Sequence, residues 1–174
     1  AGYARGRPLR CPPAPGSVPA SCGATDLCSC AIVSFHRRDV SSPLFSIITC
    51  TLNSAGWIDE SIRSVLCQRN VTIDYVFVDG GSTDGTLEKL RAIPREITLI
   101  ENRRNGISDA MNAGVAAARG DIVAHLHSDD YYLHPDVLIS VAHRFASSGC
   151  RWLFGRTARA IDGQLRPESY TAPR

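Results

Sequence analysis

No stretch of the sequence approaches the roughly 18 consecutive apolar residues that a membrane-spanning helix requires. The longest apolar runs have the length of a strand, such as Ile122 to Leu126. The arginine-rich start also lacks the continuous apolar core of a secretory signal, because it is interrupted by Pro12, Pro13, Pro15 and Pro19. The sequence therefore predicts no transmembrane segment and a cytoplasmic location, with any association at the inner face of the membrane being peripheral.

An excess of charge of either sign is missing as well. The 19 lysines and arginines nearly balance the 17 aspartates and glutamates, which leaves a formal net charge of +2. This balance gives no electrostatic reason to expect a polyanion, so nucleic acid is not predicted as a partner. The seven cysteines lack the spacing of structural zinc sites, and Cys50, Cys67 and Cys150 are expected to be reduced thiols in apolar surroundings.

Regular hydrophobic patterning is absent from the first 43 residues. They carry prolines, glycines, serines and cysteines without the periodicity of a helix or a strand. We therefore interpret residues 1–43 as a disordered or non-native leader and residues 44–174 as the folded domain.

From Leu44 onward, short β-rich runs alternate with amphipathic segments, which is typical of βαβ units. Strands are expected at residues 45–51, 73–78, 97–100, 121–127 and 152–161. Helices are expected between them, with Asn53 or Ser54 capping the first, Pro94 ending the second, Gly120 ending the third and Pro135 opening the fourth. The predicted fold class is α/β, with a mainly parallel sheet flanked by helices.

Polar residues follow several of these strands, at the edge where ligands bind to parallel α/β sheets. Thr51 ends the first strand and Asp79 ends the second. Asp79 is expected to accept hydrogen bonds from a nucleoside base or ribose, while Gly80 and Gly81 let the backbone approach the ligand closely. A plain turn before a capped helix is the alternative interpretation of this segment.

Two adjacent carboxylates, Asp129 and Asp130, follow the strand that is predicted at residues 121–127. Like charges placed together repel each other unless protons or a cation compensate them. Mg²⁺ or Mn²⁺ is the simple compensation, because these ions favour one or two carboxylates together with substrate phosphates. A solvated turn is the alternative, but the position at the end of a buried strand favours a metal site.

Four motifs in order carry a family resemblance, and they run from about Phe45 to Asp136. They are Ser46-Ile47-Ile48-Thr49-Cys50-Thr51-Leu52-Asn53, Val78-Asp79-Gly80-Gly81-Ser82-Thr83-Asp84-Gly85-Thr86, Gly106-Ile107-Ser108-Asp109-Ala110-Met111-Asn112-Ala113-Gly114 and His127-Ser128-Asp129-Asp130-Tyr131-Tyr132. The chain resembles the family 2 glycosyltransferases of GT-A fold. The Asp-Ala-Met-Asn form is similar to that of bacterial transferases that build envelope polysaccharides and glycolipids.

The resemblance implies a role for each matching residue. Thr51 and Asp79 would hold the nucleoside, Asp109 would line the donor pocket, Asp129 would contact the ribose or the sugar, and Asp130 would ligate the metal. The implied reaction moves a sugar, with inversion, from a nucleoside-diphosphate sugar to a hydroxyl of a saccharide or glycolipid acceptor. Without the resemblance, Asp109 is equally well explained by the helix dipole, which favours an acidic residue in the first turn.

The chain also departs from the family pattern. Asn102 and Arg104 stand where many relatives carry acidic residues, so Arg103 or Arg104 could approach the diphosphate, although a solvated arginine is the simpler interpretation. His125 and His127 share one face of a strand, but without a third ligand we interpret them as residues that pack or form a hydrogen bond.

A catalytic base is not assigned. In the family this carboxylate and the acceptor-binding segments lie well beyond the metal motif, whereas 174 − 130 = 44 residues follow Asp130 here. Asp162 reads as part of a hairpin turn and Glu168 lies in a proline-containing tail. We therefore expect a GT-A domain whose C-terminal acceptor part is missing, and a truncated nucleotide-sugar-binding module without turnover is the alternative.

A dinucleotide-dependent oxidoreductase is disfavoured. The first strand leads into Thr51-Leu52-Asn53-Ser54 rather than into the Gly-x-Gly-x-x-Gly turn of dinucleotide-binding folds.

Overall fold

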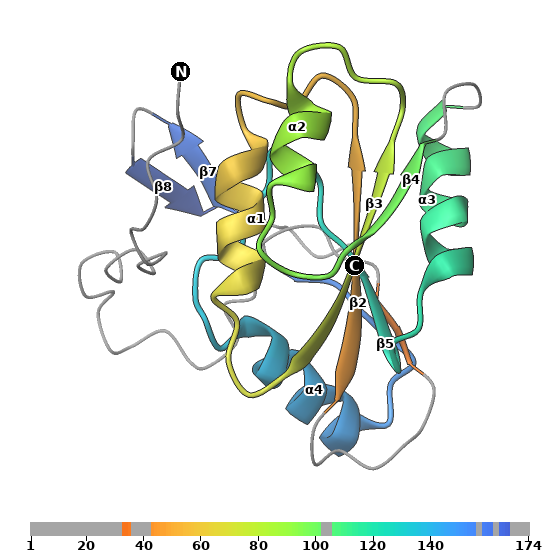
Figure 1. Ribbon diagram of the computed structural model, residues 1–174. Helices are drawn as coiled ribbons and strands as arrows, with labels where there is room; N and C mark the ends of the chain where they lie inside the picture. The colour runs from red at the N-terminus through yellow and green to blue at the C-terminus, as the bar shows by residue number, and fades with distance from the viewer. Residues whose placement is uncertain (1–32, 36–42, 102–105, 156–157, 162–163, 168–174) are drawn as a thin grey trace.

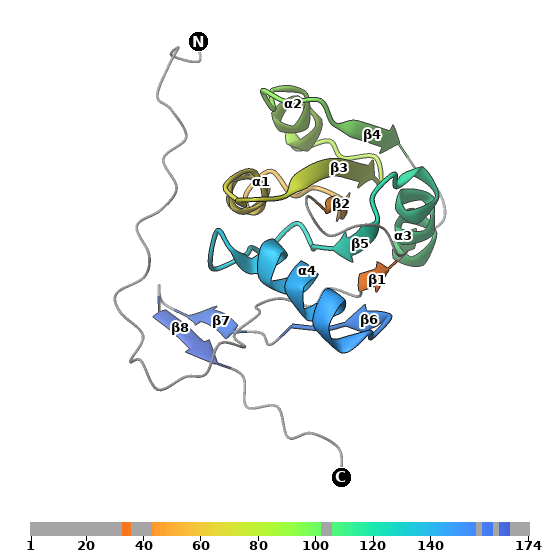
Figure 2. The same cartoon turned by 90° about the horizontal axis from the view of Figure 1, so that it is seen from below.

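The computed structural model describes residues 33–35, 43–101, 106–155, 158–161 and 164–167. Its central feature is a six-stranded sheet (Figure 1), and Figure 2 shows the strand order β4-β3-β2-β5-β1-β6. The strands are β1 (Val33–Phe35), β2 (Leu44–Thr51), β3 (Thr72–Asp79), β4 (Thr98–Glu101), β5 (Ile122–His125) and β6 (Trp152–Leu153). A separate hairpin consists of β7 (Ala158–Ile161) and β8 (Gln164–Pro167).

The middle of the sheet is parallel. Strand β2 pairs in parallel with β3 on one side and with β5 on the other, and β3 pairs in parallel with β4. The carboxyl ends of these four strands therefore lie at one edge. Strands β2 and β3 are buried almost along their whole length, as expected for parallel strands that are covered on both faces. These findings confirm the predicted α/β class with a mainly parallel sheet.

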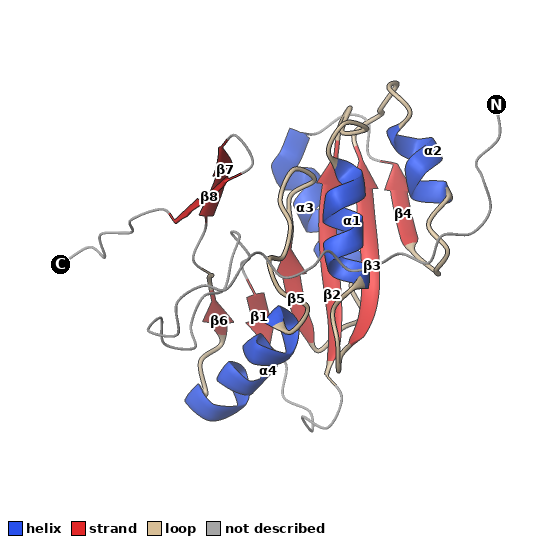
Figure 3. Ribbon diagram, turned by 90° about the vertical axis from the view of Figure 1, so that its left-hand side faces the viewer, coloured by secondary structure: helices blue, strands red, loops and turns tan. Residues whose placement is uncertain are grey.

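In the part of the chain that the structure describes, four helices cover the two faces of the sheet. They are α1 (Ile58–Leu66), α2 (Thr86–Arg91), α3 (Gly106–Ala117) and α4 (Val137–Ser148). Figures 2 and 3 show α3 on one face and α1 and α4 on the other. The α3 face has a small apolar core around Ile48, Val76, Val78 and Ala110. The larger core, which includes Phe45, Phe77 and Phe145, fills the face beneath α1 and α4.

Two glycines allow α3 and the turn after it to lie close to β2. A Cβ atom at Gly114 would collide with the Ile48 side chain. A Cβ atom at Gly120 would collide with the backbone of Ser46 and Leu44. Gly120 was predicted to end the helix, but α3 ends earlier, at Ala117, and Gly120 is instead required for the close approach to β2.

At the opposite edge of the sheet, where the parallel strands begin, Asp74 links neighbouring segments by hydrogen bonds. Its buried carboxylate accepts hydrogen bonds from the Ser46 hydroxyl (2.6 Å), from the Arg119 backbone amide (3.0 Å) and from the Arg119 guanidinium (2.7 and 3.1 Å). Burial raises the pKa of Asp74, but these hydrogen bonds and the charge of Arg119 outweigh burial and leave the pKa below its ordinary value. The contact ties the turn after α3 to two strands of the sheet.

Three further details differ from the predicted elements. Helix α1 follows Trp57 and has no side-chain cap, so the predicted caps Asn53 and Ser54 are wrong. The run predicted as one strand at 152–161 is two strands, β6 and β7, which belong to different sheets. Strand β1, which was not predicted, lies inside residues 1–43 and pairs antiparallel with β5 and β6.

Other predictions fall partly outside the described residues. These include most of the predicted leader at 1–43, the turn at Asp162, the tail with Glu168, and Arg103 and Arg104. Within the described part of the chain, no helix is both long enough and apolar enough to cross a membrane. The cytoplasmic location stays a prediction.

Candidate functional site

Thr51 and Asp79 are the last residues of two neighbouring strands. They are partners in the parallel register of β2 and β3, and both are buried, with 4% and 0% of their surfaces exposed. The Thr51 hydroxyl donates a hydrogen bond of 2.8 Å to Asp79 Oδ2. The sequence-based expectation that these two side chains meet at the carboxyl edge of the sheet agrees with this placement.

The Asp79 carboxylate organises the loop that follows it. Besides the Thr51 hydroxyl, its Oδ2 accepts a hydrogen bond from the Ser82 hydroxyl (2.6 Å). Its Oδ1 accepts hydrogen bonds from the backbone amides of Gly81 (2.9 Å) and Ser82 (2.8 Å). Burial raises the pKa of Asp79, but the four hydrogen bonds outweigh burial and hold the pKa below its ordinary value. The carboxylate is therefore charged, and hydrogen bonds from the protein fill the roughly four acceptor positions that its two oxygens offer.

The β3–α2 loop is in turn hydrogen-bonded to the β2–α1 loop. The backbone amide of Asn53 donates to the Ser82 hydroxyl, and the backbone amide of Thr83 donates to the side-chain oxygen Oδ1 of Asn53, each at 2.9 Å. Asn53 has a positive φ of 51°, as has Gly81 with 98°, so both loops use left-handed backbone conformations. These contacts join residues about 30 positions apart in the sequence.

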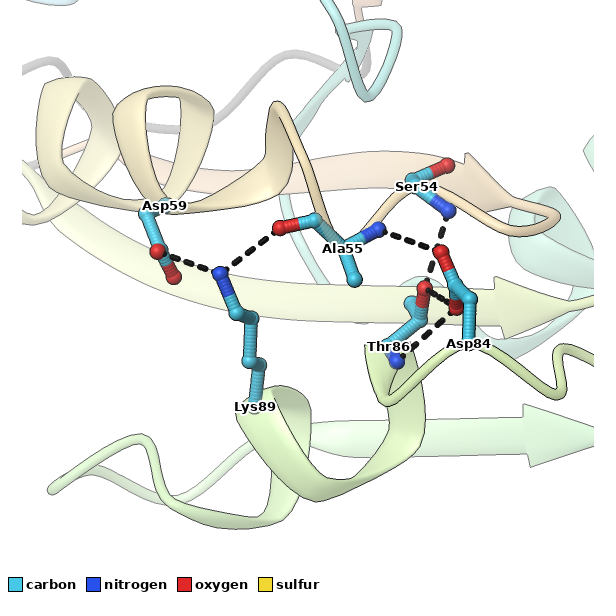
Figure 4. A network of polar contacts seen from close by, with 6 residues as sticks. All are labelled: Ser54, Ala55, Asp59, Asp84, Thr86 and Lys89. Carbon is cyan, nitrogen blue, oxygen red and sulfur yellow. Dashed lines mark hydrogen bonds and ion pairs between the residues drawn. The ribbon is translucent and has the colours of Figure 1, made fainter.

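Figure 4 shows how the same two loops are joined near the start of α2. Asp84 accepts hydrogen bonds from the Ala55 amide (2.9 Å) and from the Thr86 hydroxyl (2.6 Å). The Thr86 oxygen accepts a hydrogen bond from the Ser54 amide at 2.9 Å. Lys89 bridges to α1 by donating to the Ala55 carbonyl (2.7 Å) and to the Asp59 carboxylate (2.6 Å). The two loops therefore form one hydrogen-bonded unit.

Asp129 and Asp130 lie in a turn just beyond β5. The turn is closed by a hydrogen bond of 3.1 Å from the Asp130 amide to the His127 carbonyl. Asp129 is exposed and Asp130 is half-buried. In contrast to Asp79, neither carboxylate forms a hydrogen bond or an ion pair with another described residue. Among the described residues, the two carboxylates thus have no partner that a ligand would have to displace.

The turn with the two aspartates is held close to the other loops by Ser54. The Ser54 hydroxyl donates a hydrogen bond of 2.9 Å to the hydroxyl of Ser128, the residue before Asp129. Because β3, β2 and β5 are adjacent and parallel, Asp79 and Asp130 lie at the same edge of the sheet. The structure thus brings together the strand ends that the sequence analysis singled out.

Within the described ranges, no group of three or more histidine, cysteine or acidic side chains could hold a metal by itself. His125 is half-buried, and burial together with the neighbouring His127 lowers its pKa. The interpretation of His125 and His127 as residues that pack or form a hydrogen bond stays a prediction.

Asp109 occupies the first turn of α3 and is half-buried. Its position after β4 places it on the carboxyl side of the sheet, on the face that α3 covers. Residues 102–105, which join β4 to α3, are outside the described ranges.

Several residues of the site were missed from the sequence. Asn53, Ser54, Ser82 and Asp84 hold the loops in place, but the first two were interpreted as helix caps. The Asp-Gly-Thr sequence after Thr83 signalled a turn before a helix. Nothing in the sequence signalled that this turn would pair with a loop about 30 residues earlier.

The parallel α/β sheet, with polar loops gathered at one edge, is that of the GT-A class of glycosyltransferases. The model of the family described as Glycosyl transferase family 2 matches residues 46–167. The chain belongs to glycosyl transferase family 2.

Individual relatives support the same assignment. An uncharacterised glycosyltransferase of Mycobacterium tuberculosis (strain ATCC 25618 / H37Rv) is 32% identical over 111 residues, which are 63% of this chain and 42% of that protein. The succinoglycan biosynthesis protein ExoO of Rhizobium meliloti is 39% identical over 113 residues, which are 63% of this chain and 32% of ExoO.

A solved structure with a similar fold is the mannosyltransferase PcManGT from Pyrobaculum calidifontis, in complex with GDP-Man and Mn²⁺. Its TM-score is 0.58 at 28% sequence identity, and the match covers 64% of this chain and 35% of PcManGT. The chain spans less than half of the length of each of these three proteins.

Proposed function

We propose that this domain binds a nucleoside-diphosphate sugar together with Mg²⁺ or Mn²⁺, for transfer of the sugar with inversion to a hydroxyl of a saccharide or glycolipid. One observation carries the proposal. The buried Asp79, whose carboxylate accepts hydrogen bonds from the protein, lies at the same edge of the sheet as the carboxylates of Asp129 and Asp130. The hydrogen bond between Ser54 and Ser128 joins the two parts of this edge. A hydrogen-bonded polar loop beside carboxylates that have no partner among the described residues suits a ligand with a nucleoside at one end and a cation-bound diphosphate at the other.

In this proposal Thr51 and Asp79 form the nucleoside end of the site. All four hydrogen bonds to the Asp79 carboxylate come from the protein, so direct contact with a base or ribose requires one donor, such as the Ser82 hydroxyl, to be exchanged. We therefore assign to Asp79 mainly the task of shaping the loop around Gly80 and Gly81, whose backbone approaches the ligand. Asp109 lines the donor pocket from α3.

The diphosphate end of the site is formed by the turn after β5. Asp130 would ligate the cation, and Asp129 would contact the ribose or the sugar. The cation, when bound, stabilises the negative charge that develops on the departing diphosphate. Inversion also needs a carboxylate that takes the proton of the acceptor hydroxyl, and no described residue is assigned to that task.

The relatives support the chemistry and the biological context of this proposal. PcManGT was solved with GDP-Man and Mn²⁺, which are a nucleoside-diphosphate sugar and a divalent cation. ExoO is named for succinoglycan biosynthesis, which supports a role in making an envelope polysaccharide or glycolipid. Because the chain spans less than half of these proteins, donor binding without turnover is the second candidate function.

Isothermal titration calorimetry with UDP and GDP, each with Mn²⁺, Mg²⁺ or EDTA, tests the proposed site. Replacing Asp130 with Ala should weaken nucleotide binding in Mn²⁺ by at least about tenfold, because the cation loses a protein ligand. The same change should leave binding in EDTA as in the unaltered protein. Asp136→Ala, which removes a carboxylate a few residues further on that pairs with His134, is the matched control and should bind normally.

Full Mn²⁺-dependent binding by the Asp130→Ala variant would refute its assigned role. A transfer assay with a panel of nucleotide sugars separates the two candidate functions. Sugar transfer by this chain alone would reject the second candidate.

A further inference from the structure

Ser54 connects two parts of the carboxyl edge that lie far apart in the sequence. Its side chain is buried, with 5% of the residue exposed. Its backbone amide donates to Thr86 Oγ1 at 2.9 Å, which fixes it to the start of α2, directly after the β3–α2 loop. Its hydroxyl donates to Ser128 Oγ at 2.9 Å, across a sequence separation of 74 residues. Ser54 therefore connects the end of the loop that begins at Asp79 with the turn that carries Asp129 and Asp130.

The position of the Ser54 hydroxyl is set by more than one contact. The neighbouring Ala55 is held on both sides, by Asp84 at its amide and by Lys89 at its carbonyl (Figure 4). Asp84 also accepts from the Thr86 hydroxyl, whose oxygen holds the Ser54 amide. A movement of the β3–α2 loop would thus move Ser54, and through it the turn that carries Asp129.

We propose that Ser54 is a positioning residue that couples nucleotide binding to cation binding through its hydrogen bond to Ser128. The proposal rests on the proposed donor and cation site. When a nucleotide orders the β2–α1 and β3–α2 loops, the Ser54 hydroxyl holds the Ser128 turn so that the Asp129 and Asp130 carboxylates face the diphosphate. By thermodynamic linkage, a cation bound at that turn strengthens nucleotide binding by the same factor.

Coupling can be distinguished from a purely structural role. A structural contact would change the stability of the protein but not the ratio between nucleotide affinities measured with and without the cation. A coupling contact changes that ratio and leaves the affinity measured without the cation unchanged. The link also predicts that removal of either hydroxyl lowers the ratio to the same extent, because each removal breaks the hydrogen bond between the two serines. The longer contacts of the Ser54 hydroxyl with the Leu52 backbone (3.4 and 3.5 Å), which Ser54→Ala also removes, do not reach the Ser128 turn.

The test uses calorimetric titration of UDP and GDP into the full chain, with saturating Mn²⁺ and with EDTA. The variants are Ser54→Ala, Ser128→Ala and the double variant. Ser128→Thr keeps a hydroxyl and should keep the coupling. Ser140→Ala is the control because the Ser140 hydroxyl donates to the Asp136 carbonyl at the start of its own helix, away from the Ser54–Ser128 contact. Ser128 is half-buried, so its variants report on the link even where the buried Ser54→Ala change impairs folding.

The ratio of the dissociation constant in EDTA to that in Mn²⁺ should fall about fivefold in Ser54→Ala and in Ser128→Ala, the size expected for one lost hydrogen bond. The double variant should lose no more than either single variant. Changes below about twofold in both single variants, or additive losses in the double variant, would overturn the coupling while the donor site stands. Absence of nucleotide binding by the unaltered chain would instead overturn the proposed function, and the coupling with it.

Discussion

At the scale of single residues, the acidic side chains of the carboxyl edge have opposite surroundings. Asp79 is fully buried and accepts four hydrogen bonds from the protein, whereas Asp129 is exposed and has no partner among the described residues. A carboxylate with all its acceptor positions filled contributes to stability and to the shape of a loop. In the proposed function, the Asp129 carboxylate is instead left to contact the ligand.

Replacing Asp79 with Asn tests whether its carboxylate contributes to the stability of the protein. The amide cannot accept all four hydrogen bonds and turns an N–H group towards other donors, so the free energy of unfolding should fall by about 2 kcal/mol. Asp129→Asn is the matched control and should change the free energy of unfolding by less than about 0.5 kcal/mol. Urea denaturation measures both values, and equal stabilities of the two variants would contradict the role given to Asp79.

The sequence indicated where these residues lie, but not what each of them does. Strand periodicity and the strand-end rule were enough to place Thr51, Asp79, Asp129 and Asp130 at one edge. The contacts that fill the acceptor positions of Asp79 come partly from Thr51, 28 residues earlier. Such pairings depend on the register of parallel strands, which local sequence patterns do not specify.

At the scale of secondary-structure elements, clear hydrophobic patterns predicted the right type of element. The predicted start of α1 and end of α3 were wrong. Buried runs such as Leu44–Thr51 are strands because the sheet is covered on both faces. Ser54 was expected to cap α1, since serine is a frequent cap, but its polar groups are used by Thr86 and Ser128 in other loops. Tertiary contacts thus replaced the local role that the sequence predicted.

Gly120 gives a prediction for the packing between elements. In Gly120→Ala the new methyl group would meet the backbone of β2, which cannot move aside as the end of a flexible side chain can. The free energy of unfolding should fall by about 2 to 3 kcal/mol. Gly56→Ala, where nothing lies within 4 Å of the new Cβ, should be neutral or slightly stabilising in the same thermal or urea denaturation. Equal effects of the two changes would show that the close approach to β2 is not required.

At the scale of the whole molecule, the arrangement follows from parallel strand order. Adjacent strands β3, β2 and β5 bring three loops to one edge, while the Asp74–Arg119 ion pair lies at the opposite edge. The α/β class was predicted from the alternation of β-rich and amphipathic segments, and the family from four ordered motifs. The match over residues 46–167 confirms the family. Strand β1 was not readable, because a three-residue strand within a proline-rich segment has too little pattern to be recognised.

In the proposed function a nucleotide and its cation bind together at the edge formed by Asp79, Ser128 and Asp130. Paramagnetic broadening of backbone amide signals in NMR spectra, with Mn²⁺ and UDP or GDP added together, locates the bound cation. Signals of Gly80 to Ser82 and of Ser128 to Asp130 should broaden, while the signals of Asp74 and Arg119 at the opposite edge stay sharp. Broadening centred on Asp74, with the Ser128 to Asp130 signals unaffected, would contradict the account.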